Sequence, residues 1–413
     1  MNLREDATTI INKAIAAALP DTAVKSTLQT ISLPTRVSLV AIGKAGYQMA
    51  KAAYEVLGNR IEQGIVITKY GHSSGDLGPI AVYEAGHPVP DENSIKATEA
   101  VLRMTKECHE GDIIIFLVSG GGSALFESPL ISLSELQNIN RQLLASGADI
   151  VEMNTIRKRF SSVKGGRFAE ACAPAHIISI VLSDIVGDPL DMIASGPAYP
   201  DSSTSAEAMA IFNKYDLQLS KKALELLSRE TPKALKNVDT YITGSVTQLC
   251  ASASATAKSM GYEPIVLTSS LTCEAKEAGC MLASIAQYHH KDGKDLAFIA
   301  GGETVVHLSG TGMGGRNQEL ALSAAEGISG IDNVCVFSVG SDGTDGPTDA
   351  AGGIVDGGTK AILSKCGISI PDILARNDSY HALKMCDGLV VTGPTGTNVN
   401  DLCVVLIRGK SQR

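Results

Sequence analysis

Short runs of β-branched and other apolar residues alternate with longer amphipathic stretches, such as 45–58 and 93–109, through the first half of the chain. Apolarity along a whole run, without alternation of apolar and polar positions, is typical of parallel strands buried on both faces. The pattern predicts a doubly wound, Rossmann-like parallel α/β sheet, whose functional groups gather beyond the carboxyl ends of the strands. The expected strands are RVSLVAIG (36–43), GIVITK (64–69), IAVYEAG (80–86), DIIIFLVSGG (112–121) and HIISIVLSDI (176–185).

The pattern changes at about residue 202, where the chain becomes charged and helical up to about residue 237. A second α/β series follows, so we expect two domains: residues 1–240, and a smaller α/β domain of residues 241–413 with a mixed sheet. The pattern leaves open whether the part of 371–413 with short helices packs on the first domain. The second series has expected helices over 245–260, 273–291 and 315–328, and expected strands EPIVLTS (263–269), DLAFIAG (295–301), ETVVHLS (303–309), NVCVFSVG (333–340) and LCVVLI (402–407).

The first twenty residues predict an amphipathic helix. Their apolar positions recur at helical spacing, whereas Glu5 and Asp6 stand where a secretion signal needs basic residues. No uncharged apolar run approaches the about 20 residues that a bilayer-spanning helix requires. Nine cysteines without a C-x-x-C suit reduced thiols better than a disulfide framework. We therefore expect a cytoplasmic protein that does not bind membranes.

The overall charge narrows the class of partner. A formal net charge of −9 argues against a nucleic-acid binder, because neutralising phosphates requires clustered Lys and Arg. The eight histidines form neither an H-E-x-x-H motif nor a Cys/His cluster, so a structural zinc site is not expected.

Two Gly-rich loops in the first half follow predicted strands. In VSGGGSALFESP (118–129) three glycines, Gly120, Gly121 and Gly122, allow backbone N–H groups to converge on a phosphate or carboxylate, and Ser119 and Ser123 add hydroxyl groups. The alternative is a tight strand-to-helix turn. AIGKAG (41–46) places Lys44 at another strand end, where it either contacts an anion or lies in solvent.

SDIVGDPLDMIASGP (183–197) supplies three carboxylates after the fifth predicted strand. Asp184 directly follows the strand, where a general base or a magnesium ligand would stand. Asp188 and Asp191 are interpreted as turn or cap residues.

The segment SGTGMGGRNQELAL (309–322) has two interpretations. Its glycines at 310, 312 and 315 satisfy the G-x-G-x-x-G fingerprint of dinucleotide-binding proteins, which would suit an NAD(P)-dependent enzyme. The helix then opens with Arg316, whose guanidinium suits a carboxylate or phosphate. Glu303, just upstream, is a candidate metal ligand or base, or an exposed strand residue.

Two further loops close the series. GSDGTDGPTDAAGG (340–353) has Asp342 at a strand end, and we interpret Asp345 and Asp349 as turn residues. TGPTGTNVND (392–401) contains Asn398, and asparagine in such a loop ordinarily forms a turn.

Ten segments, in order from about residue 40 to the C-terminus, resemble the class II glycerate kinases, also called the glycerate 2-kinase or MOFRL family. They are AIGKAG (41–46), GHPVPD (86–91), VSGGGSAL (118–125), NTIRK (154–158), KGGR (164–167), SDIVGDPLDMIASGP (183–197), GGETVV (301–306), GMGGRNQE (312–319), GSDGTDGPTDAAG (340–352) and TGPTGTNVND (392–401). The resemblance implies ATP-dependent, Mg²⁺-assisted phosphorylation of D-glycerate to 2-phosphoglycerate by a two-domain α/β enzyme.

Phosphoryl transfer asks for positioning and for positive charge where negative charge accumulates. We expect Arg316 to bind the glycerate carboxylate or the transferring phosphoryl group, with Arg157 and Arg167 as weaker candidates. Asp184 is favoured over Asp342 as the base that accepts the proton of the 2-hydroxyl. The expected magnesium ligands are Asp184, Glu303 and Asp342, and the expected nucleotide contacts are Lys44, Ser119, Gly120, Gly121, Gly122, Ser123 and Asn398.

Two alternatives compete with the kinase: an NAD(P)-dependent hydroxypyruvate reductase that uses the glycines of 310–315, and a non-catalytic protein that binds a small anion. The residues themselves do not decide whether the 2- or the 3-hydroxyl is phosphorylated, nor which nucleotide is preferred. We expect a monomer or a homodimer.

Overall fold

The computed structural model describes residues 2–409, and the chain divides into two compact units. The first unit comprises residues 20–183 and 188–243, and the second comprises the residues up to 19, 184–187 and those from 244 onward. The passage at 243/244 lies close to the expected boundary at 240. Helix α1 (Leu3–Ala17), which the sequence led us to place in the first domain, instead belongs to the second unit.

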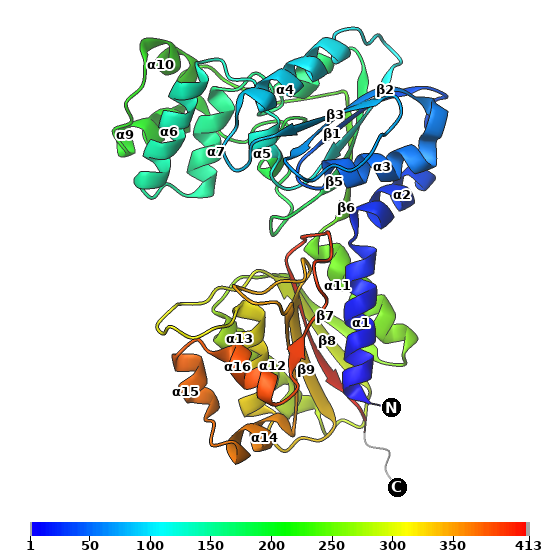
Figure 1. Ribbon diagram of the computed structural model, residues 1–413, viewed down its shortest axis with the longest axis vertical. Coiled ribbons are helices and arrows are strands. Elements are labelled where there is room, and N and C mark those ends of the chain that lie inside the picture. The colour runs from blue at the N-terminus through cyan, green and yellow to red at the C-terminus, as the bar shows by residue number, and fades with distance from the viewer. Residues whose placement is uncertain (1, 410–413) are drawn as a thin grey trace. The chain divides into compact units, whose positions relative to one another are not determined.

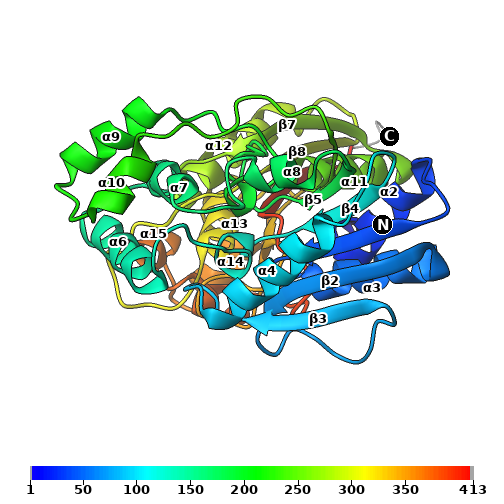
Figure 2. The ribbon, with the colours of Figure 1, turned by 90° about the horizontal axis from the view of Figure 1, so that it is seen from above.

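The first unit is built on a six-stranded sheet in the order β3-β2-β1-β4-β5-β6, and its first five strands pair in parallel as expected. Figure 2 shows β2 and β3 side by side at one edge. The sequence pattern missed β6, because its residues are mostly half-exposed and polar. The strands are β1 (Val37–Ile42), β2 (Ile61–Lys69), β3 (Ile80–Ala85), β4 (Ile113–Val118), β5 (His176–Leu182) and β6 (Val238–Gly244).

Helices of the first unit cover the sheet and extend beyond it. Beside the sheet, α6, α7, α9 and α10 pack around an apolar cluster of their own that includes Leu136, Ile156 and Ile211 (Figure 1). The helices are α2 (Pro20–Thr30), α3 (Gly46–Leu57), α4 (Glu92–Thr105), α5 (Gly122–Leu125), α6 (Leu133–Ala145), α7 (Ile150–Arg159), α8 (Arg167–Cys172), α9 (Ser205–Lys214) and α10 (Lys221–Leu227).

The strand order of the first unit reverses between β1 and β4. Ligands of open α/β sheets bind beyond the carboxyl ends of the strands at such a switch point. The loops that follow β1 and β4 are joined there, because Ser119 N donates to Ile42 O at 3.0 Å and Lys44 N donates to Gly120 O at 2.9 Å. The topology therefore brings together two of the loops that the sequence singled out.

The second unit has a mixed six-stranded sheet in the order β11-β10-β9-β12-β8-β7, as expected. The last strand, β12, lies between β8 and β9 and is antiparallel to both. The strands are β7 (Glu263–Leu271), β8 (Leu296–Gly302), β9 (Val334–Gly340), β10 (Gly352–Asp356), β11 (Leu389–Val390) and β12 (Asp401–Ile407).

Helices line both faces of this second sheet (Figure 1). Helix α1 lies along α11 and turns its buried Ile10, Ile11 and Ile15 inward, while α12 and α13 pack against each other on the other side. The short helices α15 and α16 contact α13, so they belong to this unit. The helices not yet bounded are α11 (Val246–Ser259), α12 (Ala275–His289), α13 (Arg316–Gly327), α14 (Thr359–Lys365), α15 (Ile370–Ala375) and α16 (Ser379–Met385).

Two local predictions were wrong. ETVVHLS (303–309) is no strand: it forms one isolated bridge, from Val305 to Glu274, and Leu308 is 82% exposed. Conversely, β10, which the sequence pattern did not predict, begins within the stretch interpreted as a loop (340–353). Its Gly352 sits so close to the carbonyl of Ser338 on β9 that a side chain would collide. In both segments tertiary packing, rather than local apolarity, decides the structure.

Within residues 2–409 no helix is long and apolar enough to cross a membrane.

Candidate active site

The loops after β1 and β4 form a compact polar surface in the first unit. Gly43 has φ +108°, and a side chain there would collide with Ser119. The Ser119 hydroxyl donates to Ile42 O at 3.2 Å and accepts from Ala45 N at 3.1 Å. Ser119, expected to contact phosphate directly, is therefore occupied in holding the two loops together.

Lys44 extends from this surface with an exposed side chain. A Cβ on Gly121, which has φ +85°, would lie 3.1 Å from Lys44 Cγ and 3.1 Å from His87 Nε2. Only a glycine leaves room for these two side chains here. Burial lowers the pKa of His87, and the positive charges of Lys44 and Lys69 lower it further. His87 is a candidate that we did not single out from the sequence.

The glycines between Ser119 and Ser123 leave donors available. Among residues 2–409 we find no protein acceptor for the backbone N–H groups of Gly120 and Gly121. The Ser123 hydroxyl lies 2.8 Å from that of Ser195, which donates to Asn154 Oδ1 at 3.0 Å. Free N–H groups beside an exposed lysine suit an anion such as a phosphate.

The two arginines predicted as weaker anion ligands differ in their surroundings. Arg157 Nε donates to Asn140 Oδ1 at 2.7 Å, and Arg157 lines a cavity together with Gly121 and Ser123. Arg167 donates to the carbonyls of Lys158 and Ser161, each at 2.6 Å. Arg157 thus lies within reach of a ligand, whereas Arg167 fastens the backbone of its own unit.

The aspartates after β5 also differ from one another in their surroundings. Asp184 lies two residues beyond Leu182, the last residue of β5, and is half-buried. Asp191 is more than a turn residue, because it accepts from the buried Lys158 ammonium at 3.2 Å. Lys158 also binds Asp201 at 2.9 Å. Burial opposes ionisation of Asp201, but hydrogen bonds from Thr231 and Lys158 bring its pKa down to about 2. This ion-pair network holds the chain after the strand in place.

In the second unit, charged groups gather where β8 and β9 end and β12 begins. The antiparallel register sets Asp401 opposite Gly302 on β8 and Gly340 on β9. Glu303 and Asp342, one and two residues beyond those glycines, therefore share one edge of the sheet with Asp401. The sequence analysis named Glu303 and Asp342 as candidate metal ligands but gave no reason to choose Asp401.

Arg316, the first residue of α13, is the centre of this edge. Its Nε and Nη2 atoms donate to the two oxygens of Asp401 at 2.5 and 3.0 Å, and its Nη1 lies 3.2 Å from Glu303. Burial raises the pKa of Asp401, and the guanidinium opposes that rise. Glu303 in turn accepts from Asn400 at 3.1 Å. The planar fork of Arg316 is thus held in a fixed orientation.

The loop after β9 corrects the sequence interpretation of its aspartates. Asp345 is 3% exposed and accepts from the backbone N–H groups of Asn317 and Gln318 at 3.1 and 2.9 Å, so it caps α13 rather than merely forming a turn. Burial raises its pKa to about 6, although these hydrogen bonds lower it. Asp342 is half-exposed and accepts from Thr344 N at 2.9 Å.

Two other predictions for this unit, the nucleotide contact at Asn398 and the magnesium ligands, have little direct support. Asn398 is exposed, whereas its neighbour Asn400 is buried, has φ +65° and keeps a side-chain oxygen for which we find no partner in residues 2–409. No group of three or more His, Cys, Asp or Glu side chains in that part of the chain is arranged to hold a metal ion. Magnesium commonly takes one or two carboxylates together with substrate phosphates, so the metal ligands stay a prediction.

The G-x-G-x-x-G segment is not built like a dinucleotide site. Thirteen residues separate β8 from α13, in place of a tight strand-to-helix turn. Side chains at Gly310 or Gly312 would collide with the carbonyl of Arg376, and one at Gly315 would collide with Asp345. These glycines allow close contact within the chain itself, so the dinucleotide interpretation is wrong.

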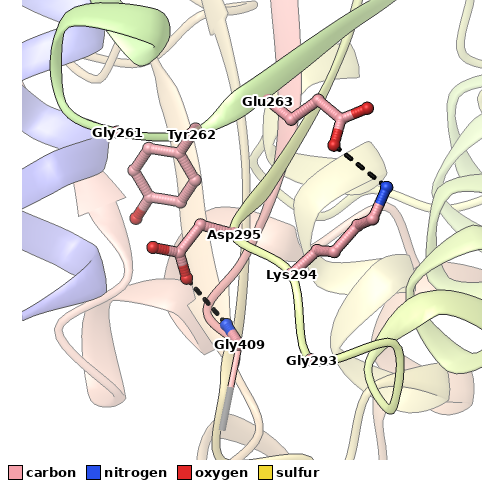
Figure 3. A pocket seen from close by; sticks show the side chains of 7 residues that line it. All are labelled: Gly261, Tyr262, Glu263, Gly293, Lys294, Asp295 and Gly409. Atoms are coloured by element: carbon pink, nitrogen blue, oxygen red, sulfur yellow. Dashed lines mark hydrogen bonds and ion pairs between the residues drawn. The ribbon is translucent and has the colours of Figure 1, made fainter. Parts of the chain in front are cut away.

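The opposite edge of the second sheet carries a polar pocket of about 480 Å³ (Figure 3). Glu263 and Lys294 form an ion pair there at 3.2 Å, and Asp295 accepts from Gly409 N at 2.8 Å. Asp295 also pairs with Arg408 at 2.7 Å, so each carboxylate of the pocket has a cationic partner. The pocket is lined by none of the residues that the sequence predicted.

Comparison with known proteins decides the family. A domain of unknown function, DUF4147, matches residues 6–228, and the MOFRL family matches residues 296–401. D-Glycerate 2-kinase of Thermotoga maritima is 53% identical, over 98% of this chain and 99% of that protein. The chain belongs to the glycerate 2-kinase (MOFRL) family.

The structure agrees with this family. The crystal structure of a glycerate kinase from Thermotoga maritima has a TM-score of 0.94 and 52% sequence identity, over 98% of this chain and 99% of that one. A relative from Agrobacterium vitis, which carries a provisional hydroxypyruvate reductase name, is 39% identical over 96% of this chain and 93% of that protein. This likeness is weaker than the 53% identity to the Thermotoga maritima kinase.

Proposed function

We propose that the protein is a D-glycerate 2-kinase, which transfers the γ-phosphoryl group of ATP to glycerate and releases 2-phosphoglycerate and ADP. The observation that carries the proposal is the 53% identity to the Thermotoga maritima enzyme over almost the whole of both chains. Because the match covers 98% of this chain, it extends over both units of the fold.

The first unit supplies groups that suit the phosphates of ATP. Lys44, whose side chain is exposed, lies beside Gly120 and Gly121, whose N–H groups have no protein acceptor among residues 2–409. A lysine provides a mobile point charge, and fixed N–H groups provide directed donors. Phosphoryl transfer depends mainly on such positioning and on compensation of the charge that spreads over the transferred group.

The second unit supplies groups that suit the acid substrate. The guanidinium of Arg316 is fixed by Asp401 and half-exposed, so its accessible face can meet the glycerate carboxylate or the transferring phosphoryl group. Of the two candidate bases, Asp184 is favoured over Asp342, since it lies two residues beyond β5, a strand of the switch-point sheet.

The proposal also includes a magnesium ion bound by carboxylates. Three carboxylates (Glu303, Asp342 and Asp401) and one guanidinium (Arg316) share the edge of the second sheet and leave a net negative charge there, which a divalent cation would balance. Glu303 and Asp342, with Asp184, are the residues that would hold it. Bound magnesium would neutralise charge on the phosphates and orient them.

The proposal is tested by coupled measurement of ADP release. Purified protein given ATP, Mg²⁺ and D-glycerate should release ADP at a rate that depends on glycerate, and removal of Mg²⁺ with a chelator should abolish the release. No change in NADH or NADPH absorbance is expected with hydroxypyruvate. A glycerate-independent ADP release, or oxidation of NAD(P)H by hydroxypyruvate, would contradict the proposal. A cytoplasmic monomer or homodimer stays the predicted form.

A further inference from the structure

A cavity of about 650 Å³ lies within the first unit, beside the Gly-rich loop. Its walls come from the loop 87–90, from the segment 121–127, and from the facing sides of α6 and α7. Neither the predicted phosphate contacts nor the predicted substrate contacts account for most of this space.

The two helices give the cavity a gradient of polarity. On α7 the lining residues Ile150, Met153 and Arg157 share one face, because they are three and four positions apart. On the neighbouring α6, Asn140 accepts from Arg157, and Leu144 lies one turn further along, toward the Ile150 end. From Ile150 to Arg157 the helix rises about 10 Å. One end of the cavity is therefore apolar, and the end about 10 Å away is polar.

The apolar end is exposed to water. Leu144 is 64% exposed and Ile150 is 57% exposed. Val89, elsewhere on the cavity wall beside the Gln137 part of α6, is 55% exposed. Single exposed apolar side chains are ordinary, but three that line the same cavity mark a place where an apolar surface can be covered. A ligand with a flat apolar face would gain free energy from this contact.

At the polar end, one carboxylate oxygen of Glu127 is buried without a hydrogen-bond donor among residues 2–409. Glu127 is 2% exposed, and its Oε2 accepts from the fully buried Lys164 at 2.6 Å. Its Oε1 is buried too, and no hydrogen-bond partner for it is found among residues 2–409. A buried oxygen of this kind costs free energy unless a donor reaches it. A hydroxyl group of a ligand in the cavity would supply that donor.

We propose that this cavity binds the nucleoside of ATP, with the base against Leu144, Ile150 and Met153 and the ribose hydroxyls donating to Glu127. The phosphates then leave the cavity past Gly121 and Ser123, which line it, toward Lys44. This assignment rests on the proposed kinase function and adds the place where the nucleotide is recognised. It also gives Glu127 the role of a nucleotide-binding residue.

Glycerate is the other ligand to consider, and it fits this cavity poorly. It has three carbons, each bearing oxygen, so it offers no face for Leu144 or Ile150 to cover. It would also fill only a small part of the volume. A nucleoside combines an apolar ring system with a diol, and this combination matches the gradient from Ile150 to Glu127.

The test compares two adjacent residues of α7. Ile150 lines the cavity, whereas Val151 is equally exposed, at 57%, and does not line it. We expect Ile150→Ser to weaken the binding of a non-hydrolysable ATP analogue by about tenfold in isothermal titration calorimetry, the loss of one apolar contact of this size. Val151→Ser should bind the analogue as the unmodified protein does.

A second variant tests the polar end. Glu127→Gln keeps the shape but weakens the acceptor, so the preference for ATP over 2′-deoxy-ATP, measured as a ratio of KM values, should shrink several-fold. The KM for glycerate should stay unchanged in both Ile150→Ser and Glu127→Gln. Because binding of the analogue needs no turnover, a missing kinase activity would leave this test readable. Unchanged nucleotide affinity in Ile150→Ser, or a raised KM for glycerate alone, would overturn the assignment.

Discussion

At the scale of single residues, the two cations that the sequence singled out, one in each unit, are held in different ways. Lys44 reaches solvent from a loop whose backbone is fixed, whereas Arg316 is bound to the buried Asp401. Sequence reasoning chose both residues from their places at strand and helix ends. It could not foresee the difference, because Asp401 reaches Arg316 only through the antiparallel pairing of β12.

Lys44→Ala should lower kcat by about 10²- to 10³-fold, since it removes a charge beside the transferred phosphoryl group. The unfolding midpoint should not change, because the side chain is exposed. Steady-state kinetics and urea unfolding of the same preparation test this prediction. Near-normal kcat would remove Lys44 from the site.

Arg316→Ala should lose activity and also stability, by about 2 kcal/mol, because it leaves Asp401 buried without its partner. The double variant Arg316→Ala/Asp401→Asn should recover much of that stability but none of the activity. Urea unfolding of the single and double variants measures the difference. If the single variant is as stable as the unmodified protein, the ion pair does not support the fold.

Asp345 gives a prediction on pH. Its pKa is raised from 3.8 to about 6, chiefly by burial, so between these values the folded protein binds more protons than the unfolded chain. The carboxyl therefore stabilises the fold fully below about pH 4, and this contribution is lost as the pH rises through 6. Its size is at most about 3 kcal/mol.

Asp345→Asn removes this titration. The stability of the unmodified protein relative to Asp345→Asn should therefore decrease between pH 4 and pH 7, as measured by urea midpoints across that range. A difference that does not vary with pH would show that Asp345 does not titrate there.

At the scale of elements, apolar runs predicted the buried strands well and the exposed segments badly. The five parallel strands of the first sheet lie where their apolarity placed them. β1, β4 and β5 are buried almost throughout, whereas the edge strand β3 is mostly half-exposed. ETVVHLS (303–309) has a similar composition but connects β8 to α13 as a loop. The sequence pattern missed β10 because it begins with two glycines. The first of them, Gly352, allows the backbone of β10 to approach that of β9 closely, and a local sequence pattern gives no sign of such a contact.

Substitution of a glycine in the segment 310–315 tests whether these glycines are required for close packing. Gly312→Ala should destabilise the protein by about 1–3 kcal/mol, because its Cβ would lie 2.5 Å from that of Asp378. Gly358→Ala is the matched control: its backbone has φ −86°, and the nearest atom to its Cβ would be 3.3 Å away. Thermal unfolding of both variants provides the comparison. Equal midpoints would mean that the glycines of 310–315 are not required for packing.

At the scale of the whole molecule, each unit presents polar groups at one edge of its sheet. The first presents Lys44 and the free N–H groups of 120 and 121, and the second presents Arg316 with its carboxylates. The sequence predicted both sets except Asp401, because Gly-rich loops after strands could be recognised without tertiary information. It did not find Glu127 or His87, because each matters only through the cavity that they line together with α6 and α7.

Identification of the product tests the central claim most directly. The protein is incubated with ATP, Mg²⁺ and D-glycerate, and the products are analysed by phosphorus and proton NMR. We expect 2-phosphoglycerate and ADP in equal amounts, and much slower formation of both with Lys44→Ala. Appearance of 3-phosphoglycerate would contradict the assignment to the 2-hydroxyl, and unreacted ATP and glycerate would contradict the kinase itself.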